Sequence, residues 1–435
     1  MKSFSAPLFL AAVLAAASGV LTSSPCPAQH PARKTPEPAL GHAFAMNRPA
    51  RLGDRRHYAP FYGYVIGPHA VVERGKILCA LQNPDGQPIV MAYDVAAGRW
   101  SEPVRASLLG LKGDDHGNPS ISIDRQGRLH VFYGCHGGPM RHTRSTKPFD
   151  ITTWQEQPPP TSRATYPQTM RMADGTICLF YRAGGHMEPW SLRTSEDDCQ
   201  TWSEAMRIIE MRLDPPDRLA AAYCQFFPGP SHQTIHCFWN HKDDNAARVS
   251  DQRPHPWRPL KYRGLHEAVY RYNVYYVHRN AEGTWQNAAG EPVELPVSKA
   301  EADAKCLVYD SGDQFTFLGN RQAVDREDRP YFKFGCGVVD WARVERRVIV
   351  PPVDKYAQFA AGRWQIHEAM PDSWPPEVRR TIESPGPAAY GGPDAAGWSI
   401  FCHRSPIEPD AGATVFLYHD ERGFATRPGG PAKVP

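Results

Sequence analysis

One turn indicates the fold of this chain most directly: Ser195-Glu196-Asp197-Asp198-Cys199-Gln200-Thr201-Trp202. Ser, Asp and Thr at these spacings favour a tight hairpin, because the carboxylate of Asp197 can accept hydrogen bonds from backbone N–H groups of the turn. A tryptophan directly after the turn is suited to packing into the body of a sheet. The stretch therefore predicts a hairpin within an all-β fold.

A short turn followed by tryptophan recurs along the chain. The five instances are Gly98-Arg99-Trp100, Thr153-Trp154, Thr201-Trp202, Gly283-Thr284-Trp285 and Gly362-Arg363-Trp364. The first two intervals, from Trp100 to Trp154 and from Trp154 to Trp202, are similar in length. A repeat of about 50 residues with several strands in each is typical of a β-propeller, here with about seven blades of four-stranded antiparallel sheet. A β-sandwich array or a β-helix with fortuitous tryptophans is the alternative.

The chain divides into four expected segments. These are a signal peptide (1–28), a Pro/Ala-rich linker or arm (29–55), a single β-propeller catalytic domain (56–425) and a C-terminal tail (426–435). Lys2 followed by the apolar run Pro7–Leu21 is the pattern of a secretory signal, with Ala28 as the last residue before cleavage. The apolar run is short for a membrane span, which disfavours an uncleaved anchor. We expect a secreted or periplasmic protein without a membrane span.

Charge and cysteine usage narrow the function classes. The 435 residues carry a net charge of +3, which offers no basic surface for nucleic acid. The ten cysteines are scattered without a Cys-x-x-Cys pair, which argues against a zinc ribbon or a dense disulfide scaffold. The expected protein is a monomer, with one or two disulfides at most.

Four side chains that suit acid–base chemistry lie at the ends of successive predicted strands. They are His116, His136, Tyr166 and Arg182, each beside a turn. Strand ends at one edge of neighbouring sheets can converge on a single pocket. Two imidazoles, a phenol and a guanidinium together suit the removal of a proton next to a carboxylate.

The turn Ser195–Trp202 resembles the Asp-box, whose pattern is Ser-x-Asp-x-Gly-x-Thr-Trp. This element typifies the sialidase-like propellers, also called BNR-repeat proteins, and it marks the scaffold rather than a catalytic site. Cys199 departs from the pattern, because it stands where glycine is expected. A left-handed backbone there would cost cysteine more than glycine.

The four side chains give a second, more specific resemblance, to the β-propeller polysaccharide lyases that cleave ulvan, an algal sulfated uronic-acid polymer. The matching segments are Asp114–Ser120, Tyr133–Gly138, Tyr166–Gln168 and Tyr181–Gly185, mainly within residues 110–190. The first interval of the quartet, His116 to His136, and the last, Tyr166 to Arg182, match the spacing of the family. The resemblance implies an acidic polysaccharide as substrate.

The chemistry of such a lyase assigns a role to each member of the quartet. The enzyme removes the C5 proton of a uronate and expels the oxygen at C4, so the uronate carboxylate must be neutralised. Arg182 is the candidate for that task, because its planar fork matches a carboxylate and keeps its charge. Tyr166 and His116 are the candidate base and acid, in an order the sequence leaves open, and His136 would assist neutralisation or orient the sugar.

Further residues are candidates for holding the sugar: Asn118, Gln168, His186 and Tyr223. Amides at strand starts also cap their own turns, and a tyrosine on a strand also packs in a core, so each has a structural alternative. Catalysis of this kind requires no cofactor. A separate cluster, His232, His236, Cys237 and His241, suggests a structural divalent metal, although its spacing matches no standard zinc module.

Two other functions compete with the lyase. A sialidase-type hydrolase needs an arginine triad and a tyrosine nucleophile, yet an Arg-Ile-Pro segment near the start of the propeller is missing. A non-catalytic propeller that binds glycans would use the same His-Tyr-Arg set for recognition. Formation of an unsaturated product distinguishes the lyase from both.

Overall fold

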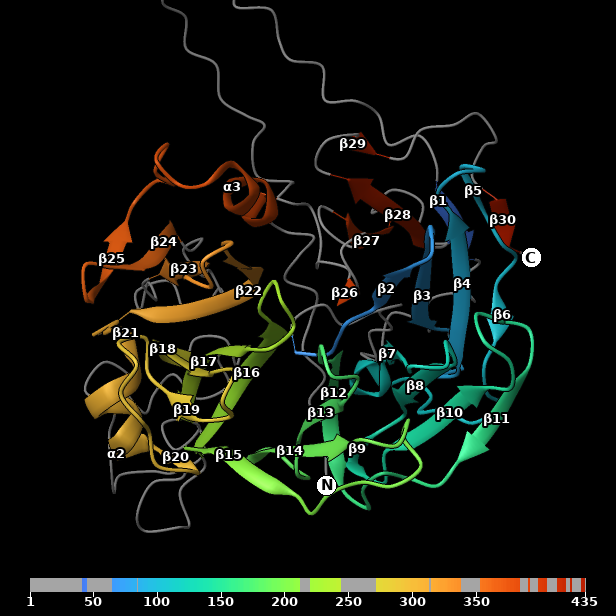
Figure 1. The fold of residues 1–435 in the computed structure, drawn as a ribbon, viewed down its shortest axis with the longest axis horizontal. Coiled ribbons are helices and arrows are strands. Elements are labelled where there is room, and N and C mark those ends of the chain that lie inside the picture. The colour runs from blue at the N-terminus through green and yellow to red at the C-terminus, as the bar shows by residue number, and fades with distance from the viewer. Residues whose placement is uncertain are drawn as a thin grey trace, which may run out of the picture.

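The computed structural model shows an all-β protein. It describes residues 41–44, 65–83, 85–211, 220–243, 271–312, 314–337, 353–383, 390–391, 398–404, 413–419, 423–424 and 432–434. The strands form six sheets, and Figure 1 shows these sheets following one another around the centre of the molecule. The arrangement fits the predicted propeller architecture.

Three of the four quartet residues lie in the third sheet, and His116 lies just before the first strand of the second. The first contains β2 (Ala70–Glu73), β3 (Lys76–Gln82), β4 (Pro88–Asp94), β5 (Arg99–Trp100), β6 (Val104–Arg105) and β26 (Tyr390–Gly391). The second contains β7 (Ser120–Ile123), β8 (Leu129–Tyr133), β10 (Arg141–Ser145) and β11 (Trp154–Gln157). The third contains β9 (His136–Gly138), β12 (Ala164–Arg171), β13 (Ile177–Arg182), β14 (Trp190–Ser195), β15 (Met206–Glu210) and β20 (Val297–Ser298).

The remaining sheets complete the arrangement. The fourth contains β16 (Ala220–Pro228), β17 (Ile235–Asp243), β18 (Arg271–Arg279), β19 (Trp285–Gln286) and β21 (Leu307–Tyr309). The fifth contains β22 (Phe315–Val324), β23 (Pro330–Gly337), β24 (Val353–Ala360) and β25 (Arg363–His367). The sixth contains β27 (Trp398–Arg404), β28 (Ala413–His419), β29 (Gly423–Phe424), β1 (Gly41–Phe44) and β30 (Ala432–Val434). The helical segments are η1 (Asp115–Gly117), α2 (Lys299–Glu301), η4 (Ala302–Cys306) and α3 (Pro376–Glu383).

The tryptophan repeat marks one position in successive sheets. Trp100, Trp154, Trp285 and Trp364 lie in β5, β11, β19 and β25, each at one end of its sheet, and Trp202 precedes β15. The repeat is therefore present in five of the sheets. The described residues form six sheets, one fewer than the seven blades expected.

The hairpin Ser195–Trp202 forms with the expected hydrogen bonds. Asp197 Oδ1 accepts from the backbone N–H of Gln200 at 3.1 Å and of Thr201 at 2.9 Å, and Ser195 Oγ accepts from the N–H of Cys199 at 2.8 Å. Cys199 has a φ of +63°, in the left-handed region. Such a conformation costs a residue with a side chain roughly 1–2 kcal/mol, so the missing glycine is a real departure.

The core lies between neighbouring sheets. Val71 and Leu78 of the first sheet share an apolar cluster with Ile121 and Val131 of the second. Phe180 of the third sheet stacks on Phe226 of the fourth, with ring centroids 4.0 Å apart. Burial of such side chains contributes roughly 1.5–3 kcal/mol each, which joins the sheets into one body.

The described parts of both terminal segments enter the sixth sheet. Strand β1 pairs antiparallel with β28 and parallel with β30. β1 lies within the segment expected to be a linker, and β30 lies within the expected tail, so parts of both segments are strands. The predicted signal peptide, 1–28, lies outside the described residues.

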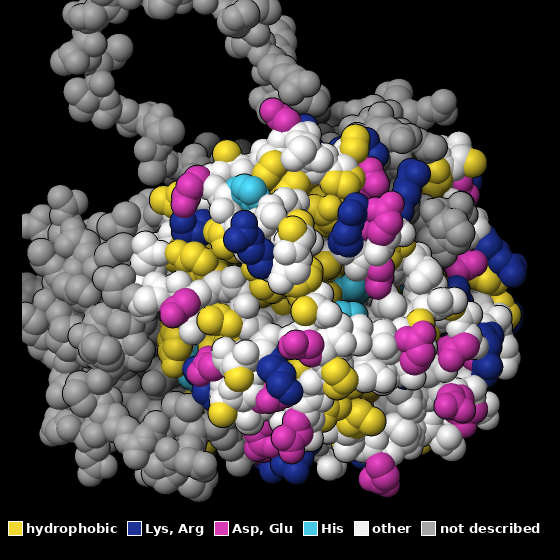
Figure 2. All heavy atoms as spheres, turned by 60° about the vertical axis from the view of Figure 1, so that its left-hand side comes forward, with side chains coloured by type: hydrophobic (Ala, Val, Ile, Leu, Met, Phe, Trp, Pro, Cys, Tyr) yellow, Lys and Arg dark blue, Asp and Glu magenta, His cyan; other side chains and the backbone are white. Residues whose placement is uncertain are grey.

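The charged side chains on the surface are mixed in sign (Figure 2), as the small net charge of +3 leads one to expect. Figure 2 shows acidic and basic side chains interspersed on the face in view. All eight cysteines whose surroundings the structure describes are buried. In the same part of the chain, no helix is long and apolar enough to span a membrane.

Candidate active site

Asp114 holds two histidines of the quartet side by side. Its Oδ1 lies 2.6 Å from Nδ1 of His116 and its Oδ2 lies 2.7 Å from Nδ1 of His136. The two imidazoles stack in parallel, with centroids 3.9 Å apart and 6° between their planes. Asp114 also caps η1 by accepting from the His116 N–H at 3.0 Å. One carboxylate thus fixes both rings and the turn that carries His116.

The same contacts shift the protonation of this pair. Burial favours the neutral forms, but it is outweighed by the hydrogen bonds and charges that Asp114 and the histidines exchange. The net result is a pKa for Asp114 well below its ordinary value, and a pKa for His116 raised from 6.5 to about 9. His116 is therefore mostly an imidazolium at neutral pH and becomes a neutral base at mildly alkaline pH.

Tyr166 lies at a bulge in β12. The pairing of β12 with β13 shifts register between Thr165 and Gln168, and Tyr166 has a φ of +63°. Bulges of this kind re-aim a side chain and are common near active sites. The Tyr166 ring lies 5.2 Å from that of His116 and stacks over Trp190 at 6.1 Å, centroid to centroid. The bulge therefore turns the phenol toward the histidine pair.

Arg182 ends β13 inside the protein. Its side chain is only 2% exposed, and its Cζ lies 4.7 Å from the centroid of the Tyr166 ring. Within the described part of the chain, neither Nε nor Nη1 of Arg182 has a hydrogen-bond partner. A buried guanidinium normally has its donors paired. Two guanidinium donors without a partner next to Tyr166 are the arrangement expected of a carboxylate-binding site with no ligand bound.

Tyr223 of β16 extends this site with a group of cations. Its ring is 6.1 Å from that of Tyr166, and it contacts Arg182 and Arg271 with Cζ-to-centroid distances of 5.9 and 4.1 Å. Its hydroxyl lies 3.4 Å from Nδ1 of His186. Burial raises the pKa of Tyr223, but Lys242, His186 and the two arginines outweigh burial and hold that pKa below its ordinary value. The surroundings of this phenol are thus strongly cationic.

Of the four residues expected to hold a sugar, the structure gathers His186 and Tyr223 near the quartet. Gln168 has a structural role, because its Nε2 donates to the carbonyls of Val65 and Cys224 and its Oε1 accepts from the Phe226 N–H. Asn118 is fully buried and donates from Nδ2 to the Asp115 carbonyl at 2.8 Å. Both amides hold the fold together, and the sugar-binding role of each stays a prediction.

The residues of the predicted metal cluster have other partners in the structure. His232 lies in a turn before β17, where its Nδ1 is 2.8 Å from the Arg171 carbonyl. His236 lies between Tyr276 and Asp328, at 2.7 and 3.2 Å. His232 and His236 do not share a strand, because β17 begins at Ile235, after His232. Across the residues that the structure covers, the groups able to hold a metal are others, and one of them is Asp114, His116 and His136.

Several residues that surround the quartet were not predicted from the sequence. Asp114 stands two positions before His116, and a carboxylate at that distance is the only local hint of its role. Lys242 lies near the end of β17 and Arg271 begins β18, far along the chain from the quartet. Trp190, which supports Tyr166 and donates to the Ala222 carbonyl at 2.9 Å, resembles any core tryptophan in sequence.

We expect Asp114→Asn to lower the pKa of His116 from about 9 toward its ordinary 6.5, because the anion that stabilises the imidazolium is removed. An NMR titration of the His116 ring measures this shift. Asp115→Asn is the matched control, since Asp115 lies farther away, at 3.3 Å, and its removal should lower the pKa less. An unchanged pKa in Asp114→Asn would contradict the role given to Asp114.

Comparison with known proteins identifies the family. The chain belongs to the BNR repeat-containing family, whose pattern matches residues 56–335 and so includes the whole quartet. One curated relative is an ulvan lyase of Alteromonas sp. (strain LOR), to which this chain is 29% identical over 300 residues. Another is the ulvan lyase PL25 of Pseudoalteromonas sp. (strain PLSV), to which it is 28% identical over 300 residues. Each match covers 62% of this chain and only 58% of the relative.

Solved structures show the same fold. A polysaccharide lyase of family PL25, an ulvan lyase, superposes with a TM-score of 0.62 at 22% identity, covering 83% of this chain and 82% of that one. A structure described as the same lyase bound to -[GlcA(1-4)Rha3S]- also gives a TM-score of 0.62, at 21% identity and the same coverage. At such identities the likeness establishes a common fold.

Proposed function

We propose that this protein is a secreted polysaccharide lyase that cleaves a uronate-containing polysaccharide by β-elimination. The observation that carries the proposal is Arg182, buried beside Tyr166 with two idle guanidinium donors. The resemblance to ulvan lyases supports the reaction class, and their names support ulvan or a related sulfated polymer as the substrate. We also keep the prediction of a propeller with a seventh blade.

The cationic group around Tyr223 suits the hardest step of the reaction. The C5 proton of a uronate is barely acidic while the neighbouring carboxylate is charged, since the carbanion would place a second negative charge beside the first. Arg182 bound to that carboxylate would stabilise the developing charge, and preorganised electrostatics of this kind is usually the largest contribution to catalysis. We expect Tyr223 and His186 to contact the same sugar, because Tyr223 lies beside Arg182 and its hydroxyl is near Nδ1 of His186.

His116 and Tyr166 supply the proton transfers. Since Nδ1 of His116 is turned toward Asp114, Nε2 is the atom that would take the C5 proton. The electron pair of the C5–H bond then forms the C4–C5 double bond, the C4–O bond breaks, and the leaving oxygen receives the Tyr166 proton. We assign His116 as the base, because its Nε2 is turned away from Asp114 and its ring becomes a neutral acceptor above a pKa of about 9.

The test is the formation of the unsaturated sugar. Purified protein is incubated with a panel of uronic-acid polymers, ulvan among them, while the near-ultraviolet absorbance of the C4–C5 double bond is recorded. A rise with at least one polymer is expected. New reducing ends without that absorbance would indicate a hydrolase instead. Binding without either signal would indicate a glycan-binding propeller, and both results would reject the lyase.

The rate should follow the titration of His116. We expect kcat/KM to rise about tenfold per pH unit below a pKa of about 9 and to level off above it, because only the neutral imidazole can accept the proton. The pH dependence of kcat/KM, which reports the free enzyme, measures this limb. A rate that falls as pH rises through 9 would instead make His116 the acid, with Tyr166 or Tyr223 as the base.

A further inference from the structure

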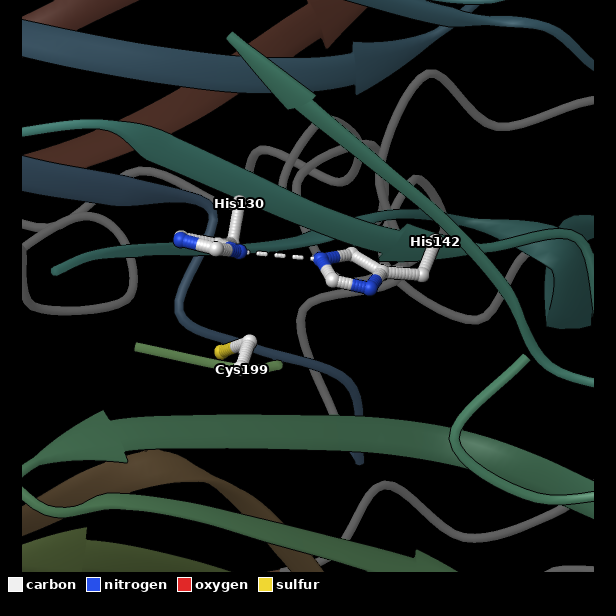
Figure 3. Close-up of side chains that lie close together, drawn as sticks. All are labelled: His130, His142 and Cys199. Carbon is white, nitrogen blue, oxygen red and sulfur yellow. Dashed lines mark hydrogen bonds between the residues drawn. The ribbon is translucent and has the colours of Figure 1, made fainter. Parts of the chain in front are cut away.

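A second set of chemically active side chains lies outside the candidate active site. His130 of β8, His142 of β10 and Cys199 of the Ser195–Trp202 turn are all buried, with exposed fractions of 0%, 1% and 6%. Figure 3 shows the three side chains close together, with the imidazoles of His130 and His142 joined edge to edge. Their potential ligand atoms all lie within 4.8 Å of one another. None of the three takes part in the proposed lyase chemistry.

The nitrogen atoms of the two histidines face each other. Nδ1 of His130 lies 2.9 Å from Nε2 of His142. In a buried, neutral pair of this kind the two facing nitrogen atoms must share either one proton or one cation. The burial of both rings favours the neutral imidazole, which is the form that binds a metal.

The carboxylate of Asp124 contacts the ring nitrogen of His130 that does not face His142. Nε2 of His130 lies 3.2 Å from Oδ2 of Asp124, so the other ring nitrogen, Nδ1, is turned toward His142. Histidines that bind metals almost always donate their second N–H to a carboxylate or carbonyl, which fixes the tautomer and the ring orientation. Asp124 is itself fixed by accepting from the Arg128 N–H at 2.7 Å.

Cys199 brings a thiol to the site at the position where the turn pattern has glycine. Its backbone has a φ of +63°, a conformation that glycine would adopt more easily. The hydrogen bonds of the turn use the Cys199 backbone N–H and the side chains of Ser195 and Asp197, and none of them uses the thiol. The hydrogen bonds of the turn therefore gain nothing from the thiol, which packs in an apolar cluster with Phe132 and Leu179, whereas the histidine pair gains a third donor.

We propose that His130, His142 and Cys199 bind a zinc ion that links the second sheet to the turn of the third. Two imidazole nitrogens and one thiolate form a ligand set for zinc or copper and not for calcium or magnesium, which take oxygen ligands. Zinc suits a buried structural site because it is not redox-active. Binding releases the thiol proton to solvent, and the ion joins two sheets that already contact each other through Arg125 and Asp198 at 3.1 Å.

The decisive variant is Cys199→Gly, because it removes the thiol and also relieves the left-handed strain. Full-length protein without a polyhistidine tag is loaded with zinc, dialysed and analysed by mass spectrometry for bound metal. We expect the wild type to hold one more zinc equivalent than Cys199→Gly. Cys178→Ala, which alters a buried cysteine of β13 outside the cluster, is the matched control and should keep the full content.

Thermal unfolding gives a second measurement, in which the wild type should melt above Cys199→Gly only while zinc is bound. With zinc, the wild type should melt above Cys199→Gly; after chelation, Cys199→Gly should melt at the same temperature or higher, since only strain then separates the two. Asp124→Asn should weaken zinc binding about 10–100-fold. Cobalt in place of zinc should give a thiolate charge-transfer band that Cys199→Gly lacks.

Three outcomes would overturn the proposal. One is a wild type that holds no more zinc than Cys199→Gly, including the case in which zinc is bound equally by both at another place. Another is a wild type whose melting temperature relative to Cys199→Gly is the same with zinc and after chelation. The third is copper, not zinc, as the ion retained in competition between the two metals.

Discussion

Arg182→Ala should lower kcat/KM on the uronate polymer by about 10²–10³-fold or more, because the developing charge on the substrate loses its preorganised partner. The near-ultraviolet absorbance of the product measures the loss. Arg182 is 2% exposed and lies against Tyr166, so the substitution also leaves a cavity. The variant must therefore be shown to be folded, by circular dichroism and by its melting temperature.

Two further variants separate charge from shape at this position. Arg182→Lys keeps a positive charge but loses the planar fork, so it should recover only part of the activity. Arg182→Met fills the space without charge, and it should be as inactive as alanine while melting closer to the wild type. An Arg182→Met protein with wild-type kcat/KM would remove the carboxylate-binding role from Arg182.

His116→Ala should lower kcat by about 10²–10⁴-fold, which is the usual contribution of a general base. The alkaline rise in kcat/KM should disappear with it, because the group that titrates at about 9 is gone. Product absorbance over a pH series measures both effects. A merely structural histidine would leave the pH profile of the residual activity unchanged.

The control for His116 is His232→Ala, since His232 bonds a backbone carbonyl in a turn outside the site. It should keep kcat within about twofold of the wild type, as expected for a residue that does not touch the reaction. Tyr223→Phe addresses the competing base, because surrounding cations lower the pKa of Tyr223. If Tyr223→Phe abolished the alkaline limb and His116→Ala preserved it, the base would be Tyr223.

The repeat could be read from the sequence because it rests on local chemistry. Each tryptophan follows a turn whose small and polar residues determine its shape, and these turns recur in successive sheets. The number of blades could not be read in the same way. The interval from Trp202 to Trp285 is much longer than the two before it, so insertions break the period. The described residues form six sheets, and the seventh blade stays a prediction.

The positions of site residues could be predicted where those residues come from neighbouring strands. The roles of residues whose partners lie far along the chain could not. His116, His136, Tyr166 and Arg182 lie together, because η1 before the second sheet and three neighbouring strands of the third bring them to one place. The part that Gln168 plays in the fold could not be predicted, because its partners, Val65 and Cys224, lie far away along the chain and give no local signal. The roles in catalysis stay predictions, since geometry alone does not measure a reaction.

The pairing of β1 with β28 has a consequence for the order in which the molecule is built. Gly41 lies opposite Phe416, so the pair joins two segments from opposite ends of the chain. Contacts that distant are slow to form, because a long loop must close before they stabilise anything. Hairpins such as β27 with β28 can form as soon as their own strands exist, whereas the sixth sheet is complete only when β1 arrives from the other end of the chain. Until then β28 has an unpaired edge, the kind of edge at which a half-folded chain is most exposed to pairing with another.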